Sequence, residues 1–178
     1  MLSAFNKTEY FSCFDAQSAF FQVELSEEAK DITAFNTHGL GQFRYLRMPQ
    51  GLTNSPATFQ RVMDMALAGV LWDSVLVFLD DVIVYSPDLE THLRDLRRFF
   101  KRVRQFGLSL SPSKTQLCRT EVTYLGHCVS SAGIRPDMVK VAAIEHMLSS
   151  PPQSKSDIRS FLGCVNYFRK FIRRSQNL

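Results

Sequence analysis

The chain has 178 residues, 45% of them hydrophobic, which is enough to bury the core of one or two domains. Its formal net charge of +4 and sequence pI of about 9.0 are compatible with a nucleic-acid partner without establishing one. The four cysteines lack Cys-x-x-Cys spacing, which argues against a zinc site or a disulfide framework and favours core residues in a reducing compartment. No membrane-length apolar run and no signal peptide are apparent, so we expect an intracellular protein without a membrane partner.

The first predicted element is a strand over residues 10–14, an apolar run that ends at Asp15. Two strands with alternating polarity are predicted next, over residues 32–36 and 42–47. A helix is then predicted to begin at Pro56, because proline suits a first helical turn and apolar residues recur after it with helical spacing.

Residues 75–85 form an apolar run that is interrupted only by Asp80 and Asp81, which predicts two short strands hinged at the acidic pair. So tight a hinge usually contains glycine, and adjacent carboxylates beside a core repel each other unless a cation compensates. A solvated acidic turn is the simpler alternative. If the strand that ends at Asp15 lies beside this hairpin, three carboxylates meet at one sheet edge, and such hard oxygen ligands suit magnesium.

A second helix is predicted after Ser86, Pro87 and Asp88, which read as a cap, a first-turn proline and an acid at the positive end of the helix dipole. Two short strands near residues 108–110 and 123–125 follow it. The predicted buried stripe of this helix consists of Leu89, Leu93, Leu96, Phe100 and Val103.

Two further helices are predicted over residues 136–148 and 154–172, the second beginning with a capping box of Ser154 and Asp157. Gly133 marks the predicted boundary before them.

We therefore divide the chain at this boundary. Residues 1–132 are predicted to form an α+β unit with a ferredoxin-like antiparallel sheet and helices on one face, and residues 133–178 a small helical unit. Most basic residues lie in two runs, within residues 94–104 and 169–174, and a solvated helix face explains either run as simply as a nucleic-acid contact does.

Five motifs, in this order, carry a resemblance to a known family. Residues 78–81, Phe-Leu-Asp-Asp, resemble the aromatic-x-Asp-Asp motif of reverse transcriptases, and the other four resemble the motifs around their polymerase palm. Order and spacing are similar to those of gypsy-type LTR retrotransposon Pol polyproteins, over nearly the whole chain. The five motifs are residues 14–22, 46–60, 78–81, 107–114 and 124–127.

The resemblance implies RNA-directed or DNA-directed DNA synthesis, in which a primer 3′-hydroxyl attacks a dNTP paired with an RNA or DNA template. It implies two Mg²⁺ ions, or Mn²⁺ instead, held by Asp15, Asp80 and Asp81. It also makes Lys114 a proton donor to pyrophosphate. A turn or cap aspartate and a solvated lysine are the alternative interpretations of Asp15 and Lys114.

The resemblance also assigns binding residues for the nucleotide. Phe20 matches the steric gate that would exclude a ribose 2′-hydroxyl, although a core phenylalanine is the rival interpretation. Gln50 and Gly51 match residues at the nucleotide pocket, where gypsy-type enzymes often carry Phe instead of Gln.

For the template and primer, Tyr124, Leu125 and Gly126 resemble the primer grip, while His127 is predicted to be a packing or surface residue because no second metal ligand stands at a suitable spacing. A glycine inside a helix costs about 1 kcal/mol relative to alanine, so the glycine of the last helix indicates close approach by the duplex or by the preceding helix. The helix face implied to follow the minor groove consists of Arg159, Gly163, Asn166 and Tyr167.

Few residues precede the first motif, and no connection, RNase H or integrase sequence follows the last one. We therefore expect a palm with its fingers largely missing and the start of a thumb, active only together with those Pol regions, in cytoplasmic virus-like particles or the nucleus. A catalytically silent remnant that binds nucleic acid or a partner is the alternative. An RNA-recognition module would need an aromatic Gly-Phe-Gly-Phe-type strand, which the sequence lacks.

Overall fold

The computed structural model of the protein describes residue 5, residues 7–149 and residues 153–171. At its centre lies a four-stranded sheet in the order β4-β5-β1-β6, in which each neighbouring pair is antiparallel. The strands of this central sheet are β1 (Tyr10–Asp15), β4 (Val75–Phe78), β5 (Asp81–Ser86) and β6 (Gln116–Arg119).

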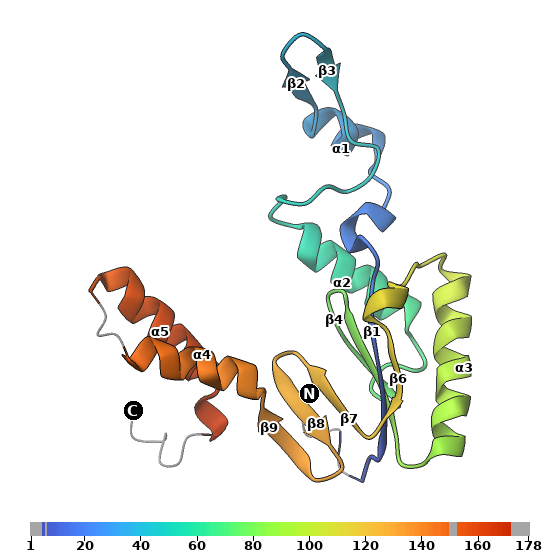
Figure 1. Ribbon diagram of the computed structural model, residues 1–178. Coiled ribbons are helices and arrows are strands. Elements are labelled where there is room, and N and C mark those ends of the chain that lie inside the picture. Colours follow the sequence, from blue (N-terminus) through green and yellow to red (C-terminus); the bar gives the residue numbers. More distant parts are fainter. Residues whose placement is uncertain (1–4, 6, 150–152, 172–178) are drawn as a thin grey trace.

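Helices α2 (Ser55–Ala66) and α3 (Leu89–Gln105) cover one face of the central sheet (Figure 1). Val84 of β5 points toward them and belongs to the same core as Phe59 of α2 and Phe99 of α3. The chain order β1-α2-β4-β5-α3-β6, with β1 between β5 and β6, is the ferredoxin-like arrangement. The predicted fold class is therefore confirmed.

A second core lies on the opposite face of the central sheet, where a three-stranded antiparallel sheet packs against it. Strand alternation explains both cores, because Phe11 and Cys13 of β1 belong to this second core whereas Phe14 belongs to the core under the helices. The strands of the small sheet are β7 (Glu121–Tyr124), β8 (His127–Ser130) and β9 (Gly133–Pro136).

The strand predictions around this small sheet need correction. Residues 108–110 form no strand, and only Leu110 makes a single bridge, to Ala16. The sequence pattern does not predict β6, β8 or β9, because strands of four residues are too short to show a clear alternation. The boundary predicted between residues 132 and 133 falls in the turn from β8 to β9, and the division into domains stays a prediction.

A small unit projects from the central sheet beyond α2 (Figure 1). It consists of α1 (Glu27–Ile32) and a hairpin of β2 (Phe35–Thr37) and β3 (Gly41–Phe43). Helix α1 and the shorter hairpin correct the strands predicted over residues 32–36 and 42–47. Periodicity misses α1 because the helix is short and polar, with no buried residue and no apolar stripe.

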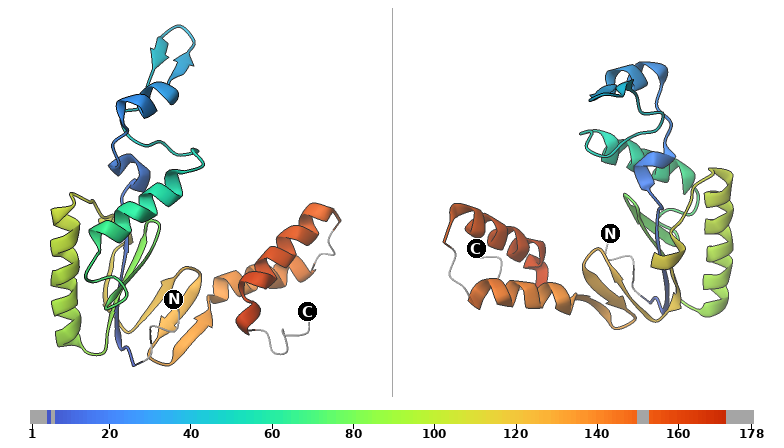
Figure 2. Two further views of the ribbon diagram at one scale, coloured as in Figure 1. Left: turned by 180° about the vertical axis from the view of Figure 1, so that it is seen from behind. Right: turned by 45° about the horizontal axis from the view of Figure 1, so that its top comes forward.

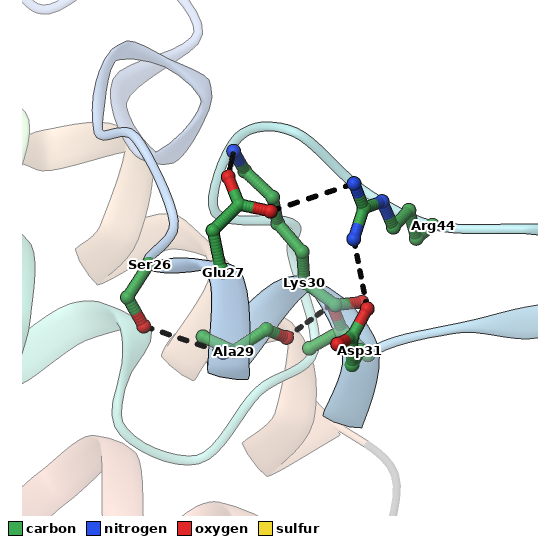
Figure 3. Close-up of polar contacts among 7 residues, drawn as sticks. Ser26, Glu27, Ala29, Lys30, Asp31 and Arg44 are labelled. Atoms are coloured by element: carbon green, nitrogen blue, oxygen red, sulfur yellow. Dashed lines mark hydrogen bonds and ion pairs between the residues drawn. The ribbon is translucent and has the colours of Figure 1, made fainter.

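Polar contacts hold α1 against the hairpin (Figure 3). The Ser26 hydroxyl caps the helix by accepting a backbone N–H of its first turn at 3.2 Å, and Lys30 Nζ lies 2.6 Å from Glu27 Oε1. Arg44, which follows β3, reaches Asp31 Oδ1 at 2.8 Å and Glu27 Oε2 at 3.4 Å. Exposed ion pairs of this kind contribute roughly 0–1 kcal/mol each, so they orient the unit more than they stabilise it.

Helix α3 begins and faces the sheet differently from the prediction. Asp88, not Ser86, is the cap, because its side chain accepts the Thr91 N–H at 2.9 Å. The predicted stripe is half wrong, since Leu89, Leu93 and Phe100 are 41–44% exposed. The buried residues of α3 are His92, Asp95, Leu96, Phe99 and Val103, so two polar side chains occupy positions where the pattern favours apolar ones.

Helices α4 (Met138–Ser149) and α5 (Lys155–Tyr167) extend from β9 on the side of the central sheet opposite to α3 (Figures 1 and 2). The predicted capping box at Ser154 and Asp157 is confirmed. Helix α5 ends earlier than predicted and is followed by the 3-10 turn η4 (Arg169–Phe171); residue 172 lies outside the described residues. Within the described part of the chain, no helix is long and apolar enough to cross a membrane.

Candidate active site

The ends of two neighbouring strands bring Asp15 and Asp81 together. Asp15 is the last residue of β1, Asp81 is the first of β5, and the two are Cα partners in the antiparallel register. Side chains directly opposite each other in such a pair lie on the same face of the sheet, with Cβ atoms about 4.5–5.5 Å apart. Both carboxylates therefore sit at one edge of the central sheet, on the face that carries the small sheet.

Asp80 lies in the tight turn that joins β4 to β5. Because the turn has no glycine, Leu79 takes the left-handed conformation with φ of 54°. Such strain costs about 1–3 kcal/mol and persists only where neighbours hold it. Here the Gln60 side chain accepts the Leu79 N–H at 2.7 Å, and the Asp80 carbonyl accepts the Ala16 N–H at 2.9 Å. Gln60 is a supporting residue that no local sequence signal identifies.

The carboxylates share one lysine. Lys114, in the 3-10 turn η3 (Pro112–Lys114), places Nζ 2.7 Å from Asp15 Oδ2. Burial raises the pKa of Asp81, the charges of Asp80 and Asp15 raise it further, and Lys114 lowers it. The hydrogen bond and charge of Asp15 raise the pKa of Lys114, so the ammonium form is favoured. The structure thus joins all four residues predicted to be catalytic in one electrostatic cluster.

The oxygen ligands at this edge suit a divalent cation that the substrate helps to hold. As the side chains lie, no group of three or more His, Cys, Asp or Glu among the described residues could hold a metal ion. Magnesium, however, is commonly bound through one or two carboxylates together with waters and substrate phosphates. Asp15 and Asp81 supply such a pair, and Lys114 places a positive charge on Asp15 where a cation would compete with it. The site fits a shared cation rather than a closed protein cage.

The predicted nucleotide residues have different surroundings. Phe20, in the 3-10 turn η2 (Ala19–Gln22), is half-buried. Its ring packs edge-to-face with the Phe59 ring, and the two ring centroids are 6.0 Å apart. Gln50 is exposed and makes no hydrogen bond within the part of the chain that the structure describes. Gly51 has φ of +91°, a conformation that favours glycine. Phe20 therefore combines a packing contact with partial exposure.

Gln22 is a further positioning residue that sequence reasoning did not single out. Its side-chain amide donates to the Ser109 carbonyl at 2.9 Å, and its oxygen accepts the Ser109 N–H at 2.8 Å. This two-way bond ties the turn that carries Phe20 to the segment that leads to Lys114. Only the fold reveals it, because the two residues are far apart in the chain.

The predicted primer-grip residues form the turn between β7 and β8. Tyr124 is buried against the carboxylate edge, and its hydroxyl donates to the Asp81 carbonyl at 3.4 Å. Leu125 and Gly126 both have positive φ, of 48° and 67°. The Tyr167 hydroxyl, from α5, donates to the Leu125 carbonyl. The structure therefore brings Tyr167 together with Leu125 and Gly126.

The remaining predicted residues of α5 lie on an open surface. Arg159, Gly163 and Asn166 are exposed and recur at helical spacing on one face. A Cβ added to Gly163 would meet no described heavy atom within 4 Å, so tight packing against α4 is not the reason for this glycine. Among the described residues, none approaches Gly163 closely.

His127 has the packing role expected of it. It is 5% exposed, stacks on Tyr167 with ring centroids 5.3 Å apart and planes 4° apart, and meets Phe168 edge-on at 5.6 Å. These contacts hold the C-terminal end of α5 against the small sheet.

Comparison with known proteins agrees with this arrangement. The family model described as reverse transcriptase (RNA-dependent DNA polymerase) matches residues 2–129. The retrovirus-related Pol polyproteins from the Drosophila melanogaster transposons 297, 412 and gypsy are 41%, 36% and 32% identical over 97% of this chain. The chain spans 14–16% of the length of these relatives.

Solved structures of a foamy viral protease-reverse transcriptase share the fold. One, described as "dRH" and in complex with double-stranded DNA, has a TM-score of 0.85 at 28% identity, and the match covers 95% of this chain and 29% of that chain. Another, in complex with an RNA/DNA hybrid, has a TM-score of 0.79 at 28% identity and covers 90% and 21%.

Proposed function

Because this chain belongs to the reverse transcriptase (RNA-dependent DNA polymerase) family, we propose that it is the catalytic core of a polymerase that extends a primer with deoxynucleotides along an RNA or DNA template. The observation that carries this proposal is the direct pairing of Asp15 with Asp81, beside Asp80 and Lys114. Relatives of this fold that hold double-stranded DNA and an RNA/DNA hybrid support the choice of nucleic-acid partner.

The carboxylates would act by gathering positive charge at the reacting phosphate. Asp15, Asp80 and Asp81 would hold two Mg²⁺ ions, or Mn²⁺ in their place. When bound, these ions would neutralise the triphosphate and make the primer hydroxyl a better nucleophile. Burial and the charges of Asp80 and Asp15 raise the pKa of Asp81, and a bound cation would offset both effects, so the cluster favours one.

Lys114 would change partners during the reaction. Its ammonium group now neutralises Asp15, and the neighbouring carboxylates keep its pKa high. If Asp15 were engaged by a cation instead, the ammonium group of Lys114 would be free to contact the triphosphate. It can then donate its proton to the leaving pyrophosphate.

The duplex would lie on the side of the central sheet that faces α4 and α5, away from α3 (Figures 1 and 2). There the β7–β8 turn, fastened by Tyr167, would contact the primer strand, and the open α5 face around Gly163 would approach the minor groove. Phe20 would select the sugar, with Gln50 and Gly51 lining the nucleotide pocket.

Primer extension on a poly(rA)·oligo(dT) substrate with Mg²⁺ tests the proposal. We expect little or no synthesis from the 178-residue chain alone, because we propose that further Pol regions complete the grip on nucleotide and duplex. A chimera in which the chain replaces the matching span of the transposon 297 polymerase should be active. The Asp80→Asn, Asp81→Asn double variant of the chimera should be inactive.

The outcomes separate the alternatives. A folded chimera that binds template–primer but makes no DNA would indicate a catalytically silent remnant instead of a polymerase core. Robust synthesis by the chain alone, lost in the double variant, would show that no further region is needed. Activity that survives the double variant would remove the aspartates from the mechanism.

A further inference from the structure

Trp72 is the sole tryptophan of the chain, and both its exposed side chain and its backbone conformation are unusual for so large a residue. It is 61% exposed and has φ of 67°, in the left-handed region that bulky residues avoid. The backbone N–H of Trp72 donates to the Val75 carbonyl at 2.8 Å, and the backbone carbonyl of Trp72 accepts a hydrogen bond from the Tyr85 hydroxyl at 3.3 Å. A large aromatic ring held in solvent by a strained, hydrogen-bonded loop is typical of a recognition residue.

Two arginines fasten this loop to α3. The Arg98 guanidinium donates to Asp73 Oδ2 at 2.9 Å and to the Gly69 carbonyl at 3.0 Å. The Arg102 guanidinium donates to the Ala66 carbonyl at 2.7 Å, at the end of α2. The indole-bearing loop is therefore held beside the basic helix.

The outer face of α3 carries cations without partners. Arg94, Arg97, Lys101 and Arg104, here called the α3 basic stripe, are exposed and recur every three or four residues, which places them on one face. None of the four side chains forms an ion pair or hydrogen bond with another described residue, although the pKa of the nearby Asp88 is lowered by that carboxylate's own hydrogen bonds with Thr91 and, after these, by the charge of Arg94. The stripe spans about 15 Å along the helix axis at 1.5 Å per residue.

Two surface hollows lie where the loop meets the helix. One, of about 530 Å³, is lined by Asp73, Arg94 and Arg98 among others. The other, of about 300 Å³, is lined by Gly69, Arg98 and Lys101 among others, and no acidic residue lines it. Arg98 borders both, and each hollow includes one residue of the stripe, Arg94 in the first and Lys101 in the second.

We propose that Trp72 and the α3 basic stripe form a second site, for single-stranded nucleic acid, with backbone phosphates along the stripe and a base stacked on the indole. A basic track beside an exposed aromatic ring is the combination that binds single strands without sequence preference. Helix α3 lies on the side of the central sheet away from α4 and α5, so the stripe is separate from the proposed duplex surface (Figures 1 and 2). Its function would be to hold an unpaired strand during copying.

Because Trp72 is the sole tryptophan, its fluorescence reports on this site alone. We expect oligo(dT), titrated into the 178-residue chain without divalent ions, to quench the emission with saturation. The Asp80→Asn, Asp81→Asn variant should be quenched equally, so the result does not depend on the polymerase proposal. Poly-glutamate at the same charge concentration should have no such effect.

Variants read by anisotropy of a labelled oligo(dT) separate the two parts of the site. Trp72→Leu should weaken binding about 5- to 150-fold, and Trp72→Phe should retain most of it, because stacking of one base contributes roughly 1–3 kcal/mol. The Arg97→Gln, Lys101→Gln variant should reduce the slope of log K against log salt by about 1.4, or roughly 0.7 per phosphate contact. Lys140→Gln with Lys155→Gln, on α4 and α5, removes the same charge and should leave the Trp72 quenching unchanged. Thermal melting of each variant excludes loss of the fold as the cause.

Three results would overturn the proposal. They are unchanged Trp72 emission while the labelled strand is saturated, no binding of single strands at all, and equal affinity of Trp72→Leu and wild type. Quenching by poly-glutamate but not by oligo(dT) would assign the surface to an acidic protein instead.

Discussion

Lys114 shows how a single side chain sets the chemistry of the carboxylate edge. It is 65% exposed, so its ion pair with Asp15 contributes little to stability in water. Its charge still acts on Asp81, whose pKa is raised by burial, Asp80 and Asp15 and lowered by Lys114. Lys114 therefore adjusts the protonation of the site rather than the stability of the fold.

Replacing Lys114 by glutamine should raise the pKa of Asp81 further, because the positive charge that lowers this pKa is lost. The side-chain carboxyl signals in a ¹³C NMR titration would report the change. Lys114→Arg keeps the charge and should leave the pKa near that of the wild type. If Lys101→Gln, on α3, shifted Asp81 as much as Lys114→Gln, a specific effect of Lys114 would be ruled out.

Phe20 combines a role in packing with the proposed role in sugar selection. In the active chimera, Phe20→Val should raise ribonucleotide incorporation relative to dNTPs, because a smaller side chain leaves room for the 2′-hydroxyl. The variant should also lose stability, by less than the roughly 3–5 kcal/mol of a fully buried Phe→Ala change, since the ring is only half-buried.

The matched control for Phe20→Val is Phe21→Val, which removes the neighbouring ring, 43% exposed. Incorporation ratios and melting curves should be measured for both. Unchanged sugar selectivity in an active, folded Phe20→Val enzyme would make Phe20 a packing residue only.

Among the elements, α3 departs most from its sequence pattern, because a series of hydrogen-bonded polar side chains lies between α3 and the central sheet. Ser86 Oγ donates to Asp95 Oδ2 at 2.9 Å, so it accepts from His92 Nδ1 at 3.1 Å. His92 Nε2 then accepts the Ser12 hydroxyl proton at 2.7 Å. These hydrogen bonds give both ring nitrogens of the fully buried, neutral His92 a partner. They explain how polar residues can face the sheet.

Acid should therefore destabilise the protein through His92. Burial lowers the pKa of His92 in the folded state, and Asp95 only partly offsets this. The unfolded chain then takes up a proton first as pH falls below about 6.5, so stability is complete above that pH and declines below it. Denaturant unfolding between pH 8 and pH 5 would measure the decline.

His92→Gln should flatten this pH dependence and lower stability at pH 8 by about 1–3 kcal/mol, because buried partners lose their hydrogen bonds. His38→Gln, at an exposed histidine, should do neither. Some dependence will remain, since burial and Lys170 also lower the pKa of His127. A wild-type slope in His92→Gln would place the acid sensitivity elsewhere.

At Gly163, the stability of α5 and the proposed binding of a template–primer duplex favour different residues. Alanine there meets open space, so Gly163→Ala should stabilise the helix by up to about 1 kcal/mol. The same methyl group should weaken binding of a template–primer duplex if the minor groove approaches this face. Thermal melting of Gly163→Ala tests the gain in stability, and titration with a template–primer duplex tests the loss of binding. Tighter or unchanged binding would exclude contact at Gly163.

The molecule is organised around a central sheet with a core on each face. Helices α2 and α3 cover one face, the small sheet covers the other, and α4 and α5 extend beyond the small sheet (Figure 2). Among the described side chains, Tyr167 links these distant parts by its hydrogen bond to Leu125 and by its stacking on His127. The position of α5 relative to the carboxylate edge thus depends on a few aromatic contacts.

Tyr167→Phe removes the hydrogen bond but keeps the ring, which should cost about 0.5–1.5 kcal/mol locally. We expect faster amide hydrogen exchange in α5, with the central sheet unchanged. Tyr45→Phe is the control, because the Tyr45 hydroxyl makes no hydrogen bond within the described residues. Unaltered exchange in α5 would mean that stacking alone holds the helix.

Local pattern was sufficient for the features whose causes lie within a few residues. The strand that ends at Asp15, the acidic pair after β4, the start of α2 and the capping box at Ser154 each depend on neighbouring side chains and were predictable, as was the α+β class that their order implies. The pairing of Asp15 with Asp81, the bond from Lys114 to Asp15 and the grip of Gln60 on Leu79 were not. Each joins segments distant in the chain, and its energy comes from cross-strand register and buried hydrogen bonds that exist only once the sheet and its helices have assembled.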